Sequence, residues 1–215
     1  MRTVCYIPML EGQVPGVQEW LQAAGARYGI TLVLLPQADW NNDLTPWPAD
    51  PVFKKGKPFG GRAESYLHRL EDETIPDIEA KLGIIPDERW LLGVSLAGLF
   101  AVWTATRSTL FTRIAAVSGS FWYPGFPEWL RTQTLSPALK ETFLSLGRKE
   151  AEGKNPHLKD IAAQTREVAD ILSQKGVPTT FAWTEGTHFA PVIPWLEQAL
   201  NQFLHKNSQS QCDQL

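Results

Sequence analysis

Ser95 lies in a segment whose residue types suit nucleophilic chemistry. Residues 89–100 read Arg-Trp-Leu-Leu-Gly-Val-Ser-Leu-Ala-Gly-Leu-Phe, which predicts an apolar strand, a tight turn and an apolar helix. A sharp strand-to-helix turn leaves little room beside the serine, and Gly93 and Ala97 are small enough for it. Such a turn would lift the serine hydroxyl off the sheet. The fit to Gly-x-Ser-x-Gly is imperfect, because the second glycine falls one residue late, at Gly98, and a turn that merely packs is the alternative.

The same turn would supply a backbone donor for an oxyanion. The N–H of Leu96 would lie at a helix N-terminus, beside the charge that develops when the serine attacks an acyl carbon. A second donor should come from the loop after the first strand. Leu10 is the first choice in that loop, and Met9 is the next.

A serine hydroxyl needs an adjacent base, and His188 is the histidine placed to act as one. It follows a Gly-Thr pair at the end of a predicted strand, and an imidazole can accept a proton and return it. Of the other histidines, His68 lies among charges on a predicted helix and His205 lies near the end of the chain. His157 belongs to a loop from which it could contact the site without being the base.

A carboxylate is also expected, to hold the imidazole tautomer and balance the imidazolium. Glu150 is favoured, because it follows the fifth predicted strand in a Gly-x-x-acid pattern. Glu152, two residues further on, and Asp160, at the start of a predicted helix, are the alternatives. Any of the three could instead be a solvated loop charge.

Six short apolar or β-branched runs alternate with helical patterns. The strands are expected at Thr3–Pro8, at Thr31–Pro36 as a buried parallel strand, in the run before Ser95, and at Ile114–Val117, Thr142–Leu146 and Thr179–Thr184. The helices are expected from Val17 to Tyr28, from Leu67 to Leu82 with a bend at Pro76, after Ser95, from Leu158 to Leu172 and from Val192 to Leu204.

This alternation predicts an α/β fold with one mostly parallel six-stranded sheet and helices on both faces. Ligands of such sheets bind beyond the carboxyl ends of the strands. Ser95, Glu150 and His188 each follow a strand, so all three should meet at one edge. The chain order Ser, acid, His is that of α/β-hydrolases.

Length and composition agree with one domain. The chain has 215 residues, of which 43% are hydrophobic, and a net charge of −3, which gives no case for nucleic acid or an anionic membrane. No apolar run approaches a membrane span, and the first one, ending at Pro8, is too short for a secretory signal. Cys5 and Cys212 do not look like a disulfide pair, so a cytoplasmic location is expected. The predicted domain is 1–206, followed by a polar, disordered tail at 207–215; nothing indicates an oligomeric state.

Residues 37–62 are rich in proline and lack periodicity, and they follow the second strand at the same edge. Loops of this length are usually functional or disordered, and large aromatic residues argue against disorder. Trp40 or Trp47 is therefore expected to line a substrate cleft, with Trp122 and Tyr123 from the loop after the fourth strand. The alternative is that these rings simply cover the end of the sheet.

Four blocks in order, at residues 93–100, 116–122, 146–150 and 185–189, resemble the putative esterase family of α/β-hydrolases. Its members include S-formylglutathione hydrolases, siderophore, feruloyl and acetylxylan esterases, and mycolyl transferases. The resemblance implies hydrolysis of a small-molecule carboxylic ester through an acyl-serine, without metal or organic cofactor. It implies Ser95 as nucleophile and His188 as base; Glu150 carries over less directly, because the acid varies in the family.

The chain departs from this family in two ways. It starts at what would be the third strand, so the usual N-terminal hairpin is expected to be absent, and Ala97 replaces the more frequent glycine or serine. Two other functions remain open: an acyltransferase with the same three residues, and a catalytically silent binding protein with the hydrolase fold.

Overall fold

A computed structural model of the chain describes residues 1–9, 14–36, 39–52, 56–152, 158–189 and 191–212. Within these ranges a central sheet has six strands, and every pairing between neighbours is parallel. In spatial order the strands are β2 (Thr31–Leu35), β1 (Thr3–Pro8), β5 (Glu88–Val94), β6 (Arg113–Val117), β7 (Glu141–Gly147) and β8 (Thr179–Thr184). The predicted α/β fold and its six strands are confirmed, with β1 and β8 at the predicted bounds.

One expectation for the sheet is wrong. The segment 31–36 was expected to be a buried strand, but β2 lies at the edge of the sheet and four of its five residues are half-buried. The sequence of β2 is apolar throughout, as that of a central strand would be. An edge strand can have such a sequence here because α1 (Val17–Tyr28) packs against it.

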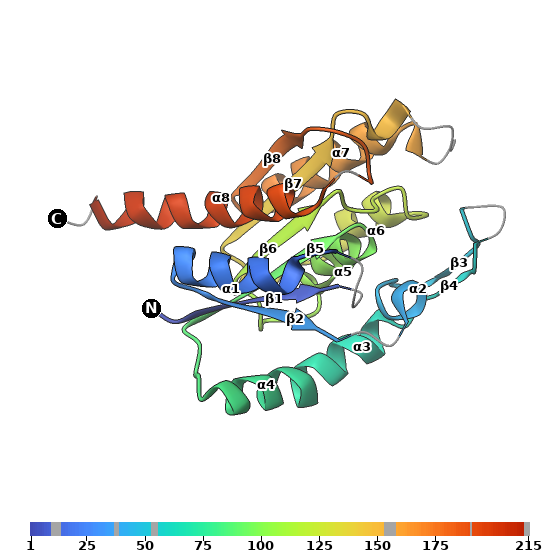
Figure 1. Ribbon diagram of the computed structural model, residues 1–215. Helices are drawn as coiled ribbons and strands as arrows, with labels where there is room; N and C mark the ends of the chain where they lie inside the picture. The colour runs from blue at the N-terminus through green and yellow to red at the C-terminus, as the bar shows by residue number, and fades with distance from the viewer. Residues whose placement is uncertain (10–13, 37–38, 53–55, 153–157, 190, 213–215) are drawn as a thin grey trace.

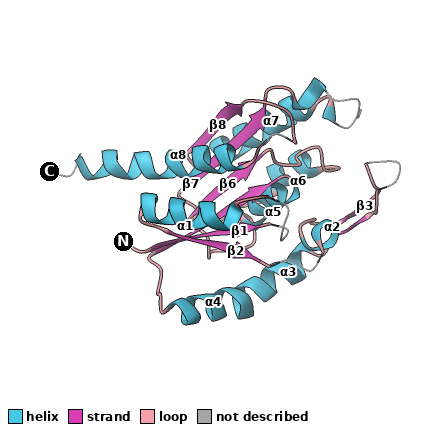
Figure 2. Cartoon of the chain, in the orientation of Figure 1, coloured by secondary structure: helices cyan, strands magenta, loops and turns pink. Residues whose placement is uncertain are grey.

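Helices cover both faces of the sheet (Figures 1 and 2). One face carries α1 and α8 (Ile193–Cys212), which contact each other. The other face carries α5 (Leu96–Thr104), α7 (Ile161–Gln174), the short α6 (Phe126–Thr132) and the α3–α4 segment described below. Two hydrophobic cores result, one on each side, and α5 is buried along its whole length.

The helix expected from Leu67 to Leu82 is interrupted. It consists of α3 (Ala63–Arg69), a π-helical turn η1 (Leu70–Thr74) and α4 (Ile75–Leu82). Pro76 lies in the first turn of α4. Because proline has no N–H and its ring clashes with the preceding turn, the wider π-helical turn accommodates it. The irregularity predicted at Pro76 therefore falls just before it.

The aperiodic segment before α3 has short elements of its own. They are α2 (Trp40–Asp43) and an antiparallel pair of two-residue strands, β3 (Pro48–Ala49) and β4 (Phe59–Gly60). The carboxylate of Asp39 caps α2 by accepting hydrogen bonds from the N–H groups of Asn41 and Asn42. These elements are too short to leave a periodic pattern in the sequence.

The last helix is longer than expected. It was predicted to end at Leu204 before a disordered tail, but α8 continues to Cys212, so residues 207–212 are helical. Across the described residues, no helix combines the length and the apolar character needed to cross a membrane. Cys5 is a buried free thiol in β1.

Candidate active site

Ser95 occupies a strained turn between β5 and α5. Its φ of 58° and ψ of −121° lie outside the regions that L-residues prefer. Backbone hydrogen bonds hold it there: Ser95 N–H donates to Val117 O at 3.0 Å, and the N–H groups of Gly98 and Leu99 donate to Ser95 O. Strain of this kind persists only where the surroundings impose it, and it is common at functional sites.

The small residues of the turn are needed for different reasons. A Cβ at Gly93 would lie 2.0 Å from the carbonyl oxygen of Ala97, so only glycine fits there. Ala97 is fully buried without such a conflict. A Cβ at Gly98 would lie 3.0 Å from the Cα of Gly119, which makes that position tight as well. The turn therefore tolerates alanine at its fifth position and uses the displaced glycine for packing.

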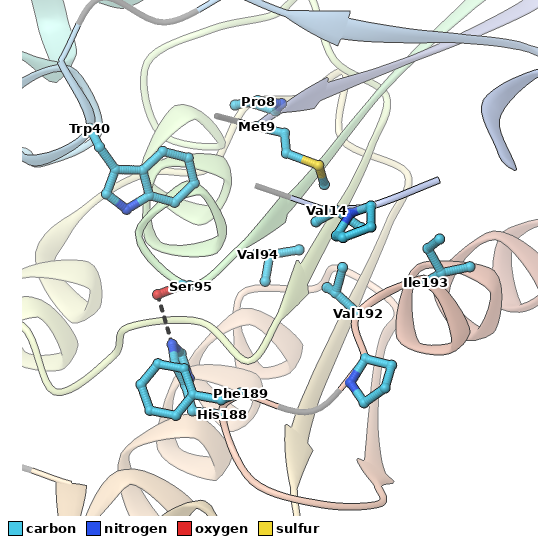
Figure 3. A pocket seen from close by; sticks show the side chains of 12 residues that line it. Pro8, Met9, Val14, Trp40, Val94, Ser95, His188, Phe189, Val192 and Ile193 are labelled. Carbon is cyan, nitrogen blue, oxygen red and sulfur yellow. Dashed lines mark hydrogen bonds between the residues drawn. The ribbon is translucent and has the colours of Figure 1, made fainter. Parts of the chain in front are cut away.

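The structure brings Ser95, His188 and Glu150 together at the carboxyl edge of the sheet. His188 Nε2 lies 3.1 Å from Ser95 Oγ, and His188 Nδ1 lies 3.0 Å from Glu150 Oε2 (Figure 3 draws the first contact). Ser95 follows β5, Glu150 follows β7 and His188 follows β8. One ring nitrogen thus faces the hydroxyl and the other faces the carboxylate.

The Glu150 carboxylate is buried and fully bonded. Its side chain is 2% exposed, and besides the imidazole it has two donors on Oε1: Gly147 N–H at 2.8 Å and Ser118 Oγ at 2.5 Å. A buried carboxylate is stable only with such partners. Because of them, Glu150 is held in one orientation toward His188.

The other described candidates, Glu152, Asp160 and His68, are exposed. Glu152 is exposed in the same short 3₁₀ turn as Glu150, and Asp160 is exposed just before α7. His68 is exposed and lies 3.8 Å from Glu64. His157 is outside the described residues, as is the side chain of His205.

Two serines after β6 also reach the site, and the sequence analysis assigned them no role. Ser118 has a φ of 51°, and its hydroxyl lies 2.9 Å from His188 Nδ1 as well as contacting Glu150. Ser120 Oγ lies 3.3 Å from Ser95 Oγ. The sequence could have indicated that these serines lie at the site, because the Ser-Gly-Ser run follows a strand that ends at the same edge.

The backbone of Leu96, the predicted oxyanion donor, adjoins Ser95. Leu96 is the first residue of α5 and directly follows Ser95, so its N–H belongs to the unpaired first turn of that helix. Leu10 lies outside the described residues, whereas Met9 is described and is buried after β1.

Two cavities flank Ser95. The first, which we call the first pocket, has a volume of ≈ 540 Å³. It is lined by Pro8, Met9, Val14, Pro15, Trp40, Val94, Ser95, His188, Phe189, Pro191, Val192 and Ile193. The other, which we call the second pocket, has a volume of ≈ 410 Å³. It is lined by Trp40, Asn41, Pro51, Val52, Gly56, Lys57, Phe59, Ser95, Leu96, Ser120, Trp122, Leu158, His188 and Phe189. Both volumes are in the range of small-molecule sites.

Comparison with known proteins identifies the family. The family described as Putative esterase matches residues 13–203. The chain belongs to this esterase family. A Bacillus subtilis (strain 168) protein, "Uncharacterized protein YbbA", is 30% identical over 138 residues. The match covers 63% of the present chain and 55% of YbbA, so it spans about half the length of that relative.

Solved structures share the fold of this esterase-family chain. The IroE-like serine hydrolase from Shewanella oneidensis has a TM-score of 0.74 at 20% identity, over 95% of the present chain and 70% of that one. The siderophore hydrolase EstB from Aspergillus nidulans has a TM-score of 0.68 at 17% identity, over 94% and 82% of the two chains. The α/β-hydrolase fold expected from the sequence is thereby confirmed.

The four predicted cleft aromatics of the esterase-family chain divide into two pairs. Trp40 lines both pockets and Trp122 lines the second pocket. Tyr123 was expected in the cleft too, with Trp47 as the alternative to Trp40, but neither is among the residues that line the two pockets. Of the two tryptophans named as alternatives, Trp40 is the one that borders these pockets.

Trp47 and Tyr123 belong instead to an aromatic cluster beside the site. The Tyr123 hydroxyl donates to Trp47 O at 2.6 Å, and the Trp47 indole N–H donates to Pro124 O at 3.1 Å. Phe126 and Trp129 complete the cluster around the indole. Burial raises the pKa of Tyr123 to about 12, so its hydroxyl remains a donor at neutral pH. These two rings therefore pack against each other and against their aromatic neighbours.

The described residues of the esterase-family chain contain no group of three or more His, Cys, Asp or Glu side chains that could hold a metal ion. The reactive groups that the structure brings together at the edge of the sheet are a hydroxyl, an imidazole and a carboxylate. Such an arrangement can activate the hydroxyl as a nucleophile.

Proposed function

We propose that the protein is a serine hydrolase that cleaves a carboxylic ester through an acyl-serine intermediate. Ser95 is the nucleophile, His188 the general base and acid, and Glu150 the residue that orients the imidazole. The observation that carries the proposal is the unbroken contact chain from Ser95 Oγ to His188 Nε2, at 3.1 Å, and from His188 Nδ1 to Glu150 Oε2, at 3.0 Å.

The acylation step follows from this order. Ser95 Oγ attacks the ester carbonyl carbon while its proton passes to His188 Nε2. The carbonyl oxygen becomes an oxyanion beside the N–H of Leu96. When the intermediate collapses, the bond to the alcohol oxygen breaks, and His188 returns the proton to that oxygen. Deacylation repeats the sequence with water as the nucleophile, which releases the acid and restores the Ser95 hydroxyl.

Glu150 acts through the imidazole in both steps. With its carboxylate at Nδ1, the tautomer that leaves Nε2 free to accept a proton is favoured. The same carboxylate stabilises the imidazolium once it forms. Gly147 N–H and Ser118 Oγ keep Glu150 oriented without competing for the oxygen that faces the ring.

Pre-steady-state hydrolysis of p-nitrophenyl acetate tests the proposal. The wild-type protein should release a burst of nitrophenol equal to the enzyme concentration, and a fluorophosphonate probe should label Ser95. Ser95→Ala should abolish both, with its fold intact by circular dichroism. Ser145→Ala is a matched control, because Ser145 is a fully buried serine in β7 and its hydroxyl has no hydrogen-bond partner among the described residues. A folded wild-type protein with neither burst nor label would instead be a silent binding protein.

A further inference from the structure

We infer that Ser120 is a further catalytic residue of the proposed reaction. Its hydroxyl donates a hydrogen bond to Ser95 Oγ as that oxygen leaves the acyl group, and it therefore accelerates deacylation more than acylation. This inference rests on the proposed function and adds to it a residue and the step at which that residue acts.

Ser120 places a buried hydroxyl beside the nucleophile. The residue is 1% exposed, it lines the second pocket, and its Oγ lies 3.3 Å from Ser95 Oγ. Within the described part of the chain this hydroxyl makes no other hydrogen bond. Burying a hydroxyl without a partner is costly, so the contact with Ser95 is the one that satisfies Ser120.

Backbone hydrogen bonds fix this contact from both sides. Ser95 N–H donates to Val117 O at 3.0 Å, and Ser120 N–H donates to Ser95 O at 3.1 Å. Ser120 O in turn accepts a hydrogen bond from the N–H of Tyr123 at 3.0 Å. The hydroxyl is thus held beside Ser95 Oγ before a substrate binds, and the protein need not reorganise during the reaction.

The direction of the hydrogen bond follows from the role of His188. A serine hydroxyl has one proton and two acceptor lone pairs. In the proposed resting state the Ser95 proton points toward His188 Nε2, 3.1 Å away (Figure 3), so Ser120 is the donor in its contact with Ser95. In the acyl-enzyme Ser95 Oγ carries no proton, and it can then only accept.

The length of the contact indicates when it acts. At 3.3 Å it is longer than the usual O–H···O distance of about 2.5–3.0 Å, so it stabilises the neutral Ser95 hydroxyl only weakly. Catalytic hydrogen bonds are often long in the free enzyme and tighten as the reaction proceeds. An interaction that is stronger in the transition state than in the ground state lowers the barrier.

Negative charge develops on Ser95 Oγ when the acyl-enzyme breaks down. Water attacks the acyl carbon and gives a proton to His188 Nε2; the oxyanion then collapses, and the bond from the acyl carbon to Ser95 Oγ breaks. Oγ takes the proton from His188, and the carboxylic acid leaves. The Ser120 hydroxyl keeps its own proton and stabilises the charge on Oγ through a second lone pair. In acylation the same hydrogen bond also makes Oγ less nucleophilic, so its benefit there is smaller.

A single turnover of p-nitrophenyl acetate, with enzyme in excess, separates the two steps. Nitrophenol release follows acylation, and intact-protein mass spectrometry of quenched samples follows the acetyl group on Ser95. In Ser120→Ala the decay of the acetyl-enzyme should slow about 10- to 100-fold, as expected for the loss of one hydrogen bond to a developing charge. The acylation rate should change less than threefold. In the steady state kcat and KM should therefore fall together, with kcat/KM nearly unchanged.

Three other variants separate the hydroxyl from packing. Ser120→Thr retains a hydroxyl and should restore most of the decay rate. Ser120→Cys keeps the size of the side chain with a weaker donor, and it should slow the decay even if Ser120→Ala does not fold. Ser145→Ala is the matched control, because it removes a buried hydroxyl that has no partner among the described residues. It should leave both rates unchanged.

Unchanged decay in a folded Ser120→Ala would overturn the inference. Equal slowing of both steps, or slowing of acylation alone, would also overturn it, because the hydroxyl would then orient Ser95 or bind the substrate. In each of these cases a wild-type burst and labelling of Ser95 would leave the proposed function standing. A wild-type protein with neither burst nor label would reject the proposed function and the inference with it.

Discussion

The hydroxyl of Ser118 lies 2.9 Å from Nδ1 of His188, as close to the imidazole as the Glu150 carboxylate is. Ser118 reaches this point because its backbone adopts a φ of 51°, which is uncommon outside glycine. Its hydroxyl also contacts Glu150 Oε1 at 2.5 Å. Ser118 therefore joins the carboxylate and the ring, and it is a positioning residue for the proposed reaction.

Removing this hydroxyl should impair catalysis more than binding. In Ser118→Ala, Glu150 loses a charge-assisted hydrogen bond of about 1.5–3 kcal/mol, so we expect kcat to fall about 10- to 100-fold. KM should change less than threefold, because Ser118 lines neither pocket. Steady-state kinetics with p-nitrophenyl acetate measures both. Ser145→Ala removes a buried hydroxyl that has no partner in the described part of the chain, and it should keep kcat; equal losses in the two variants would mean that Ser118 only packs.

A carboxylate at position 118 should partly replace Glu150. Glu150→Ala is expected to lower kcat about 10³- to 10⁴-fold, as loss of the acid does in serine hydrolases. Adding Ser118→Asp places a carboxylate beside His188 Nδ1, and aspartate tolerates positive φ better than most residues. The double variant should recover at least tenfold in kcat. Ser118→Asn in the same background is the isosteric control, and recovery with asparagine would show that charge is not the cause.

The residues of the proposed site could be found in the sequence because one topological rule places them. Parallel strands end at a common edge, so Ser95, Glu150 and His188 could be brought together without knowledge of any side-chain direction. The role of Ser118 depends on that direction. Its positive φ results from tertiary contacts, and nothing in a Ser-Gly-Ser run specifies which hydroxyl turns toward the imidazole.

The helices and strands also differ in how well the sequence predicts them. β1 and β8 were predicted at their bounds, because continuous β-branched and apolar runs flanked by breakers mark them. The position of β2 at the sheet edge was missed, since hydrophobic periodicity does not predict the spatial order of strands. The short α2, β3 and β4 were missed because their stability comes from local capping and tertiary contacts.

Substitution of Trp47 and of Trp40 should affect different properties, stability in the first case and substrate binding in the second. Trp47→Ala removes a half-buried indole from the aromatic cluster, so the free energy of unfolding should fall by about 2–3 kcal/mol, below the cost for a fully buried tryptophan. Its KM for a bound ester should stay within twofold. Trp40→Ala, which alters a ring lining both pockets, should raise KM several-fold. Urea unfolding and ester kinetics on both variants measure these effects. A raised KM with unchanged stability in Trp47→Ala would mean that Trp47 contacts the substrate after all.

A buried ion network lies at the opposite edge of the sheet from the proposed site. Glu88, the first residue of β5, contacts Arg113 at 3.1 Å and Lys140 at 2.8 Å, and it accepts a hydrogen bond from the Trp90 indole at 2.9 Å. Burial opposes ionisation of Glu88, but these partners outweigh it and lower its pKa. The carboxylate is therefore more easily ionised in the folded chain than in the unfolded one.

The lowered pKa predicts when this network stabilises the fold. Above the unfolded value of about 4.3 the carboxylate is charged in both states and its stabilisation is complete. As the pH falls through that value toward the lower folded pKa, the unfolded chain takes up the proton first, so stability declines. Thermal unfolding should thus show a steeper loss of Tm below pH ~4.3 in wild type than in Glu88→Gln, which cannot titrate. Glu152→Gln, at an exposed loop residue, is the control and should follow wild type. Parallel curves for wild type and Glu88→Gln would mean that the pKa of Glu88 is not lowered by folding.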